Sequence, residues 1–199
     1  MVKTDISSRQ QEIIEASGKI LITKGIKALT TKNLALEMGF SESAIYRHFA
    51  NKEDIIASLF DYILENFKDR LSPILALDLG ANKKLTNIFD SQCAFFSQNP
   101  HFAMAVLADD IYYEGDKVKT ALLQIMQYKS GIIKIILEAG IEEGSVRNDI
   151  AITELQHTIV GSFRLLLHKW RLSDFNFDLP NAGKTMMNTL NLLLQNPIK

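Results

Sequence analysis

Apolar side chains recur every three or four residues along nearly the whole of this 199-residue sequence. That spacing is the period of an α-helix with one buried face, whereas a half-buried strand alternates with a period of two. No segment shows a convincing two-residue alternation, and no Asn-Gly or Asp-Gly pair marks a hairpin turn. The sequence therefore predicts an all-α protein.

Capping residues and glycines separate the predicted helices. Serine, threonine and asparagine favour helix N-termini because their side chains accept hydrogen bonds from free backbone amides, and glycine favours the residue that ends a helix. Near the N-terminus we expect helices from Ser7 or Ser8 to Gly25, from Thr30 or Thr31 to Gly39, from Glu42 to about Phe49, and from Asn51 to about Leu71, with Pro73 beyond its end. Further helices are expected over residues 83–98, 101–111, 117–139 (ended by Gly140), 150–172 and 181–194.

The composition excludes several classes of protein. A single cysteine, Cys93, cannot form an intramolecular disulfide or a multi-cysteine metal site. Its neighbours Phe95 and Phe96 favour a small buried hydrophobic role over a redox sensor. No apolar run reaches the ~18 residues of a membrane span, and residues 1–5 contain no apolar signal core. We expect a soluble, cytoplasmic protein without a metal or cofactor.

The sequence also lacks the residue patterns of catalysis. It contains no Ser-His-Asp order, phosphate-binding loop or paired carboxylates at a recognisable spacing. Four residues could suggest a metal site, but their spacing favours a solvated helix end: His101, Asp109, Asp110 and Glu114. We therefore expect a protein that is not an enzyme.

The charges are distributed unevenly although the formal net charge is only −1. Residues 1–52 carry eight basic and five acidic side chains, whereas residues 53–199 carry 14 and 18. Such an asymmetry is a mild indication that the N-terminal part meets a polyanion.

The segment from Thr31 to Phe49 contains two short predicted helices joined by Gly39 and Phe40, the pattern of a helix-turn-helix unit. Small residues, Ala35 and Ala44, allow the helices to cross closely, and Gly39 permits a positive φ in the turn. The apolar core of the pair is expected to comprise Leu34, Met38, Phe40, Ile45 and Phe49. The opposite face is polar and of a size to enter a major groove about 12 Å wide; its residues are Ser43, Tyr46, Arg47 and His48.

From Arg9 to Asp61 the sequence resembles the DNA-binding domain of TetR/AcrR-type regulators. The matching motifs are Thr30-Thr31, Ala35-x-x-x-Gly39-x-Ser41, Ala44-Ile45-Tyr46-x-His48-Phe49 and Asn51-Lys52-Glu53-Asp54-Ile55. The resemblance implies a helix-turn-helix DNA-binding domain over residues 1–52. A fourth helix, residues 52–71, would connect it to a helical ligand-binding and dimerisation domain, residues 53–199.

The resemblance also implies DNA contacts from Thr31, Lys32, Ser41, Glu42, Ser43, Tyr46, Arg47, His48 and Lys52. Ser43 and Arg47 would read base edges, while Thr31, Tyr46 and His48 would contact phosphate or sugar. Lys52 would complete an anion site at the start of the fourth helix. Two alternatives stay open. Glu42 either accepts a cytosine amino group or, preferably, stabilises the helix N-terminus; Tyr46 either contacts phosphate or belongs to the core.

The predicted helix over residues 150–172 is apolar on more than one side, which indicates burial on more than one side. Gly161 would allow close helix approach, and the last helix adds a second apolar face. A four-helix bundle shared by two subunits is the simplest solution, as the resemblance implies, although a thick monomer core is the alternative. The expected dimer residues are Leu155, Ile159, Phe163, Leu166, Met187, Leu190 and Leu194.

The resemblance further implies a ligand cavity among the middle helices. A mostly apolar pocket is predicted at Phe89, Cys93, Phe96, Met104, Tyr112, Tyr128 and Phe163, although ordinary core packing explains these residues equally well. The sequence thus favours a dimeric repressor that leaves a palindromic DNA operator when a small apolar or amphipathic ligand binds. The alternative is a DNA-binding protein with no small-molecule effector, either a constitutive regulator or a chromosome-organising protein.

Overall fold

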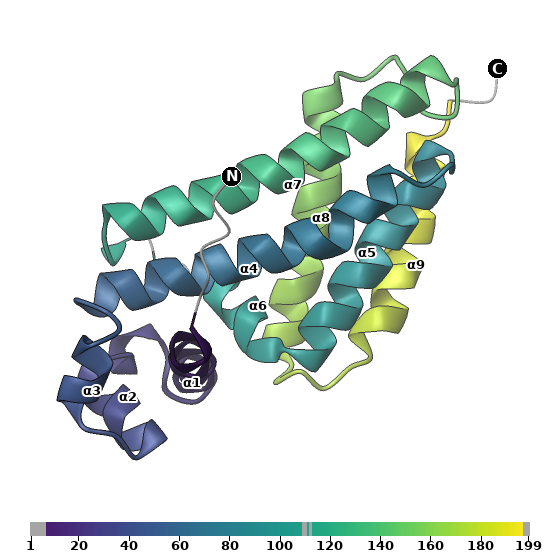
Figure 1. Ribbon diagram of the computed structural model, residues 1–199. Helices are drawn as coiled ribbons and strands as arrows, with labels where there is room; N and C mark the ends of the chain where they lie inside the picture. The colour runs from purple at the N-terminus through teal and green to yellow at the C-terminus, as the bar shows by residue number, and fades with distance from the viewer. Residues whose placement is uncertain (1–6, 109–110, 112, 197–199) are drawn as a thin grey trace. The chain divides into compact units, whose positions relative to one another are not determined.

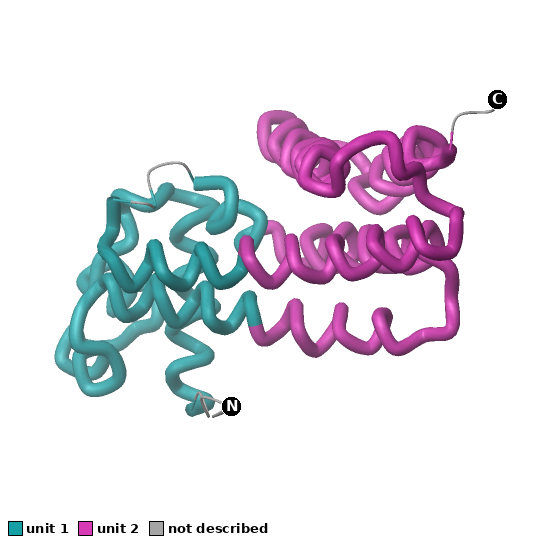
Figure 2. Tube along the Cα trace, turned by 90° about the horizontal axis from the view of Figure 1, so that it is seen from above, with its two compact units in different colours: residues 1–64, 101–125 teal, residues 65–100, 126–199 magenta. Residues whose placement is uncertain are grey.

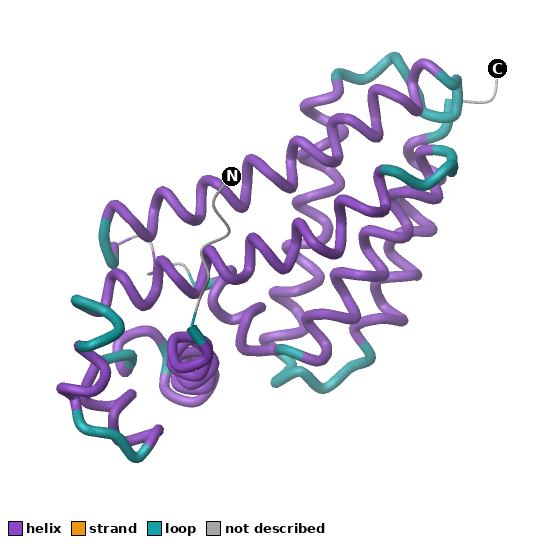
Figure 3. Tube along the Cα trace, viewed as in Figure 1, coloured by secondary structure: helices purple, strands orange, loops and turns teal. Residues whose placement is uncertain are grey.

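The computed structural model describes residues 7–108, 111 and 113–196 (Figure 1). Over these residues the chain forms nine α-helices, the short 3₁₀ helix η1 and no strand (Figure 3). The elements are α1 (Ser8–Lys24), η1 (Ile26–Ala28), α2 (Thr31–Met38), α3 (Glu42–Tyr46), α4 (Lys52–Leu75), α5 (Ala81–Gln98), α6 (Pro100–Leu107), α7 (Asp116–Glu142), α8 (Ile152–Leu172) and α9 (Leu179–Leu194). The all-α prediction is confirmed. None of the described helices combines the length and apolarity needed to cross a bilayer.

Local capping explains where the first three helices begin. Ser7 forms a capping box with Gln10, whose backbone amide donates to Ser7 Oγ at 3.2 Å while Gln10 Oε1 accepts from the Ser7 amide at 3.0 Å. Thr30 Oγ1 accepts from the Asn33 amide at 3.1 Å, and Ser41 Oγ accepts from the Ala44 amide at 3.3 Å. The predicted starts of these helices are therefore confirmed.

The ends of two N-terminal helices differ from the prediction. The third helix ends at Tyr46 rather than near Phe49, because the amides of His48 and Phe49 both donate to the Ile45 carbonyl and tighten the chain into a turn. The fourth helix continues to Leu75 instead of ending before Pro73. A proline in the last turn removes only one hydrogen bond near a terminus, so the helix can continue past it.

The later helices also shift at their ends. The predicted helix 101–111 ends at Leu107, and the predicted helix 83–98 begins at Ala81. The last helix begins at Leu179, with Pro180 in its first turn and Asp178 Oδ1 accepting from the Asn181 amide at 3.0 Å. Gly140 does not end its helix: α7 runs through it to Glu142, and the chain turns at Gly144, where φ is +74°.

The chain folds into two compact units, which Figure 2 colours separately. Unit 1 comprises residues 1–64 and 101–125, and unit 2 comprises residues 65–100 and 126–199. Helices α4 and α7 each contribute their first part to unit 1 and their second part to unit 2. Unit 1 thus contains the predicted DNA-binding segment together with the start of α4, α6 and the start of α7.

The core of unit 2 forms where α5 packs against α9 and where phenylalanines meet. The Phe89 and Phe163 rings lie edge to face with centroids 5.1 Å apart, and Phe67 contacts Phe96 in the same way at 6.1 Å. Gly183 of α9 allows close approach to α5, because an added Cβ would overlap with Cys93 Sγ.

Gly140 is required for close packing inside unit 2. A Cβ at this position would lie 2.5 Å from Val146 Cγ2 and 2.6 Å from Ala81 Cβ, both far inside van der Waals contact. We expect Gly140→Ala to lower the free energy of unfolding by about 1–3 kcal/mol, the usual cost of overpacking. Urea denaturation followed by circular dichroism measures it.

Gly131 provides the matched control on the same helix, since no atom lies within 4 Å of the Cβ position there. Gly131→Ala should stabilise the protein by about 0.5–1 kcal/mol, because alanine restricts the unfolded chain and favours the helix. Equal effects of the two substitutions would contradict the packing role of Gly140.

Candidate nucleic-acid interface

The α2–α3 pair is held by a small buried core and a tight turn. Leu34 and Ile45 are fully buried, and Ala35 and Phe49 are nearly so. Gly39 has φ +65°, its amide donates to Leu36 O, and the Phe40 amide donates to Ala35 O, which together form a Schellman motif. Two core expectations need correction, because Met38 and Phe40 are only half-buried. The geometry of α3 is therefore fixed chiefly by its contacts with α2 and by the turn.

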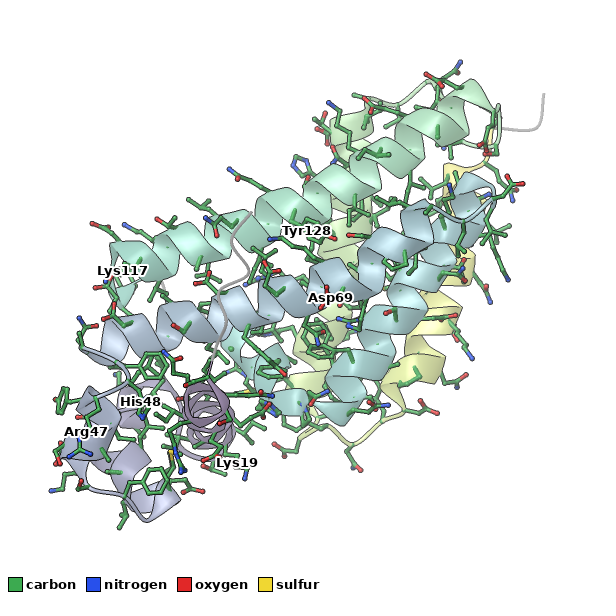
Figure 4. All side chains as sticks on the ribbon, in the orientation of Figure 1. Lys19, Arg47, His48, Asp69, Lys117 and Tyr128 are labelled. Carbon is green, nitrogen blue, oxygen red and sulfur yellow. The ribbon has the colours of Figure 1, made fainter. Side chains whose placement is uncertain are left out.

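The opposite face of α3 is open in unit 1, where Figure 4 shows Arg47 at the outer edge of the α2–α3 pair. His48 is half-buried, and its carbonyl accepts from Gln10 Nε2 at 3.5 Å. The exposed side chains on and around α3 are Ser41, Glu42, Ser43, Tyr46 and Arg47, with Lys32 exposed on α2. Most of the predicted DNA-contact residues thus share one uncovered surface of this unit.

Hydrogen bonds among its own side chains fix the geometry of this surface. Thr31 Oγ1 donates to Glu42 Oε2 at 3.2 Å and lies 3.3 Å from Tyr46 Oη. The Tyr46 side chain is 52 % exposed, which favours an outward role over a place in the core. The Glu42 carboxylate accepts a hydrogen bond from Thr31 and lies in the first turn of α3. This position favours stabilisation of the helix N-terminus over base reading. Ser41 Oγ and Ser43 Oγ pair at 2.9 Å.

The Lys52 ammonium is paired within unit 1 and is not free at the exposed α3 surface. Its Nζ lies 2.7 Å from Glu114 Oε2 and donates to the Ile26 carbonyl at 3.4 Å. Next to it, the Lys117 ammonium pairs with Asp54, and the Lys117 amide donates to Glu53 Oε1 at 2.8 Å. The start of α4 is therefore tied to the start of α7 inside unit 1. Sequence reasoning missed these pairs because the partners lie about sixty positions apart.

The structure brings several predicted pocket residues together in unit 2. Phe89, Phe96 and Phe163 are buried and in ring contact. Cys93 is also buried, and this burial raises the pKa of its thiol to about 12, which agrees with a hydrophobic role. Tyr128 is half-buried with its hydroxyl 3.0 Å from Ser72 Oγ.

The remaining two predicted pocket residues are Met104 and Tyr112. Met104 is half-buried on α6, which belongs to unit 1. Tyr112 lies outside the described residues, as do Asp109 and Asp110 of the metal cluster considered from the sequence. Within the part of the chain that the structure describes, no three His, Cys, Asp or Glu side chains gather in a way that could hold a metal ion.

The expected dimer residues mostly point into unit 2 of their own chain. Leu166 is half-buried, and the others are at most 5 % exposed: Leu155, Ile159, Phe163, Met187, Leu190 and Leu194. Large apolar side chains are also exposed on the same two helices: Val160, Leu165 and Leu172 on α8, and Leu192 and Leu193 on α9. The broad apolar surface of α8 predicts burial on more than one side. In the structure, one of these sides packs in the core of its own chain.

Comparison with known proteins matches both parts of the chain. Residues 13–59 match the family model for bacterial regulatory proteins of the tetR family, and residues 60–195 match that for the C-terminal region of YsiA-like proteins. The nucleoid occlusion factor SlmA of Shewanella woodyi is 26% identical over 169 residues, covering 84% of this chain and 83% of SlmA.

Solved structures of similar fold include two regulators named FadR. The transcriptional regulator FadR from Bacillus subtilis, in complex with stearoyl-CoA, has a TM-score of 0.81 at 20% identity, covering 90% of this chain and 96% of that one. The fatty acid degradation regulator FadR from Bacillus halodurans has a TM-score of 0.84 at 18% identity, covering 93% and 95%. At these identities the likeness concerns the fold.

Proposed function

Because the chain belongs to the TetR family of bacterial regulatory proteins and is a DNA-binding transcription regulator, we propose that it binds a palindromic operator as a homodimer and leaves it when a small amphipathic ligand binds. The observation that carries the DNA part is the uncovered polar face of α3, fixed from behind by Leu34 and Ile45. A face of this composition offers hydrogen bonds to base edges and phosphates in a major groove.

The dimer is proposed to form through the exposed apolar face of α8 and α9, with a second copy of the chain as its partner. Leu165 is 57 % exposed, Leu192 70 % and Leu193 54 %, and large exposed apolar patches on soluble proteins commonly mark interaction surfaces. Gly161 is exposed on the same side of α8 with no atom near its Cβ position, so another helix can approach closely there. A two-fold axis would make this contact isologous.

The ligand is proposed to bind in unit 2, which contains the contacting phenylalanines and also the Tyr128–Ser72 hydroxyl pair. The stearoyl-CoA complex of the similarly folded FadR supports an amphipathic ligand for this fold. A ligand that binds better to a conformer with wrongly spaced recognition helices would shift the population away from the DNA-bound form.

A second candidate function is supported by the resemblance to SlmA over 84% of the chain. In that case the protein would bind DNA without a small-molecule effector and would act in chromosome organisation. The two candidates share the DNA interface and differ only in whether a ligand changes DNA affinity.

Selection of bound duplexes from a random pool tests the DNA part directly. We expect enrichment of a palindrome whose half-site centres lie about one helical turn, roughly 10–10.5 base pairs, or a multiple of it apart. Enrichment of isolated half-sites, or of no sequence, would contradict dimeric binding. Repeating the binding with candidate ligands then separates the two functions, since an effector-free DNA organiser keeps its affinity unchanged.

A further inference from the structure

Lys129 on α7 places an ammonium group among aromatic rings of unit 2. Its Nζ lies 5.3 Å from the centroid of Phe67 and 5.4 Å from that of Phe163, two rings that are themselves buried. Among the described residues no hydrogen-bond acceptor and no carboxylate pairs with this ammonium. Burial, together with the positive charges of Arg70 and Arg164, lowers the pKa of Lys129 to about 8.

Arg70 on α4 brings a second cation to the same ring. Its guanidinium lies 5.4 Å from Phe67 and 4.3 Å from Phe95. Within the described part of the chain its hydrogen-bond acceptors are all neutral: Asn66 Oδ1 at 2.7 Å, Ser91 O at 2.9 Å, Ser91 Oγ at 2.7 Å and Gln92 Oε1 at 3.3 Å. Burial lowers the pKa of Arg70 to about 10, so it keeps its charge near neutral pH.

Gln92 adds an unused donor beside these cations. The residue is 2 % exposed, its Oε1 accepts from Arg70, and its Nε2 has no hydrogen-bond partner in the described structure. Buried polar groups in native proteins are almost always paired, and a partly buried cation without a counter-ion is costly. An anion held between these two cations and the free amide donor would supply the missing counter-charge and the missing acceptor.

We propose that Lys129, Arg70 and Gln92 receive a compact oxyanion, a carboxylate or a phosphate, at the head of the regulatory ligand, whose apolar part packs on the surrounding phenylalanines. This rests on the proposed ligand response. Ser72, two residues after Arg70, is exposed, and it pairs with the hydroxyl of half-buried Tyr128, one residue before Lys129, so solvent reaches the same stretch of α4 and α7. Figure 4 labels Tyr128 on α7.

Calorimetric titration of the full chain with three matched ten-carbon compounds tests the proposal. Decanoate and decyl phosphate carry the oxyanion, and decanol does not. We expect at least one of the two anions to bind about tenfold or more tightly than decanol, as a charge-assisted hydrogen bond contributes in a desolvated site. The stronger of the two anions identifies the headgroup.

Lys129→Met should remove the preference for the anion, while Lys134→Met should keep it. Lys134 lies on the same helix, but its exposed ammonium pairs with Glu138 at 3.7 Å. Lys129→Met should also raise the Tm of the ligand-free protein by a few degrees, because an uncompensated cation is replaced by an apolar side chain of similar length. Equal binding of acid and alcohol, binding of neither, or an unchanged preference in Lys129→Met would overturn the assignment.

Proton uptake on ligand binding distinguishes a lysine that binds the anion from a lysine with only a structural role, which would take up no proton. At pH 8 Lys129 is about half protonated if its pKa is about 8, and a bound carboxylate raises that pKa. Decanoate binding should then take up roughly half a proton at pH 8, measured by titration in two buffers of different ionisation enthalpy. The other charges that face Lys129, from α4 and α8, belong to Arg70 and Arg164. The pKa of Arg70, about 10, lies well above this pH. No uptake in the wild type would count against the site.

Release of DNA, followed separately by fluorescence anisotropy, distinguishes this inference from the proposed function. Decanoate that binds through Lys129 but leaves operator affinity unchanged would reject the ligand-release function and keep the anion site. Release that decanol and decanoate cause equally, also in Lys129→Met, would keep the function and reject the anion site.

Discussion

Arg47→Ala is expected to weaken binding to the selected operator by about 30-fold or more. A bidentate arginine–base contact contributes about 1–3 kcal/mol of discrimination, and the dimer makes this contact once in each half-site. Arg47 is exposed at the end of α3, so its removal leaves the buried contacts of Leu34 and Ile45 intact. Anisotropy titrations with the operator and with a permuted duplex of the same composition measure the effect.

The comparison of the two duplexes decides what Arg47 does. Loss of a base-reading residue weakens binding to the operator more than binding to the permuted duplex. Loss of a phosphate contact weakens binding to both duplexes equally and lowers the salt dependence. Lys32→Ala provides the contrast, since Lys32 is exposed on α2 and a lysine there is expected to contact phosphate instead of a base edge. Equal losses on both duplexes for Arg47→Ala would remove the assignment of base reading.

Leu165→Glu is expected to dissociate the dimer and to reduce operator affinity by about 100-fold or more. Two-fold symmetry places the new charge in the interface twice, where its desolvation is uncompensated. Each monomer would then hold only one half-site, so the gain from simultaneous binding of two half-sites, about 10²–10⁴, is lost. Analytical ultracentrifugation gives the oligomeric state and anisotropy gives the affinity.

Ile135→Glu is the matched control for this substitution. Ile135 is 55 % exposed and Leu165 is 57 % exposed, but Ile135 lies on α7. Both changes replace an exposed aliphatic side chain in unit 2 without opening the core, so circular dichroism should be unchanged for both. If Ile135→Glu separates the subunits and Leu165→Glu does not, the dimer face lies on α7 instead of on α8 and α9.

The N-terminal helices could be predicted from the sequence because their signals are local. The Ser7, Thr30 and Ser41 caps each act within three residues, and Gly39 ends α2 through its own backbone conformation. The polar face of α3 follows from the same local signals. A helix that begins after Ser41 and ends at the next turn directs Arg47 away from the core.

Features that depend on distant partners could not be predicted. The sequence favours Gly140 as the end of a helix, whereas in the structure it allows close packing against Ala81, which is remote in the sequence. Lys52 was assigned to DNA from its place at a helix start, and its partner Glu114 is visible only in the fold. The same holds for α8: a broad apolar helix does not indicate which side its own chain covers.

Cys93 has a practical consequence for measurement. Its thiol is 1 % exposed, lies against Gly183 and has a pKa of about 12, so maleimide reagents meet almost no thiolate there. It is also the single cysteine of the chain. One cysteine introduced at an exposed position would thus take a spin label or fluorophore selectively without first removing the natural one. A labelled dimer would then carry two probes whose separation can be followed as effectors are added.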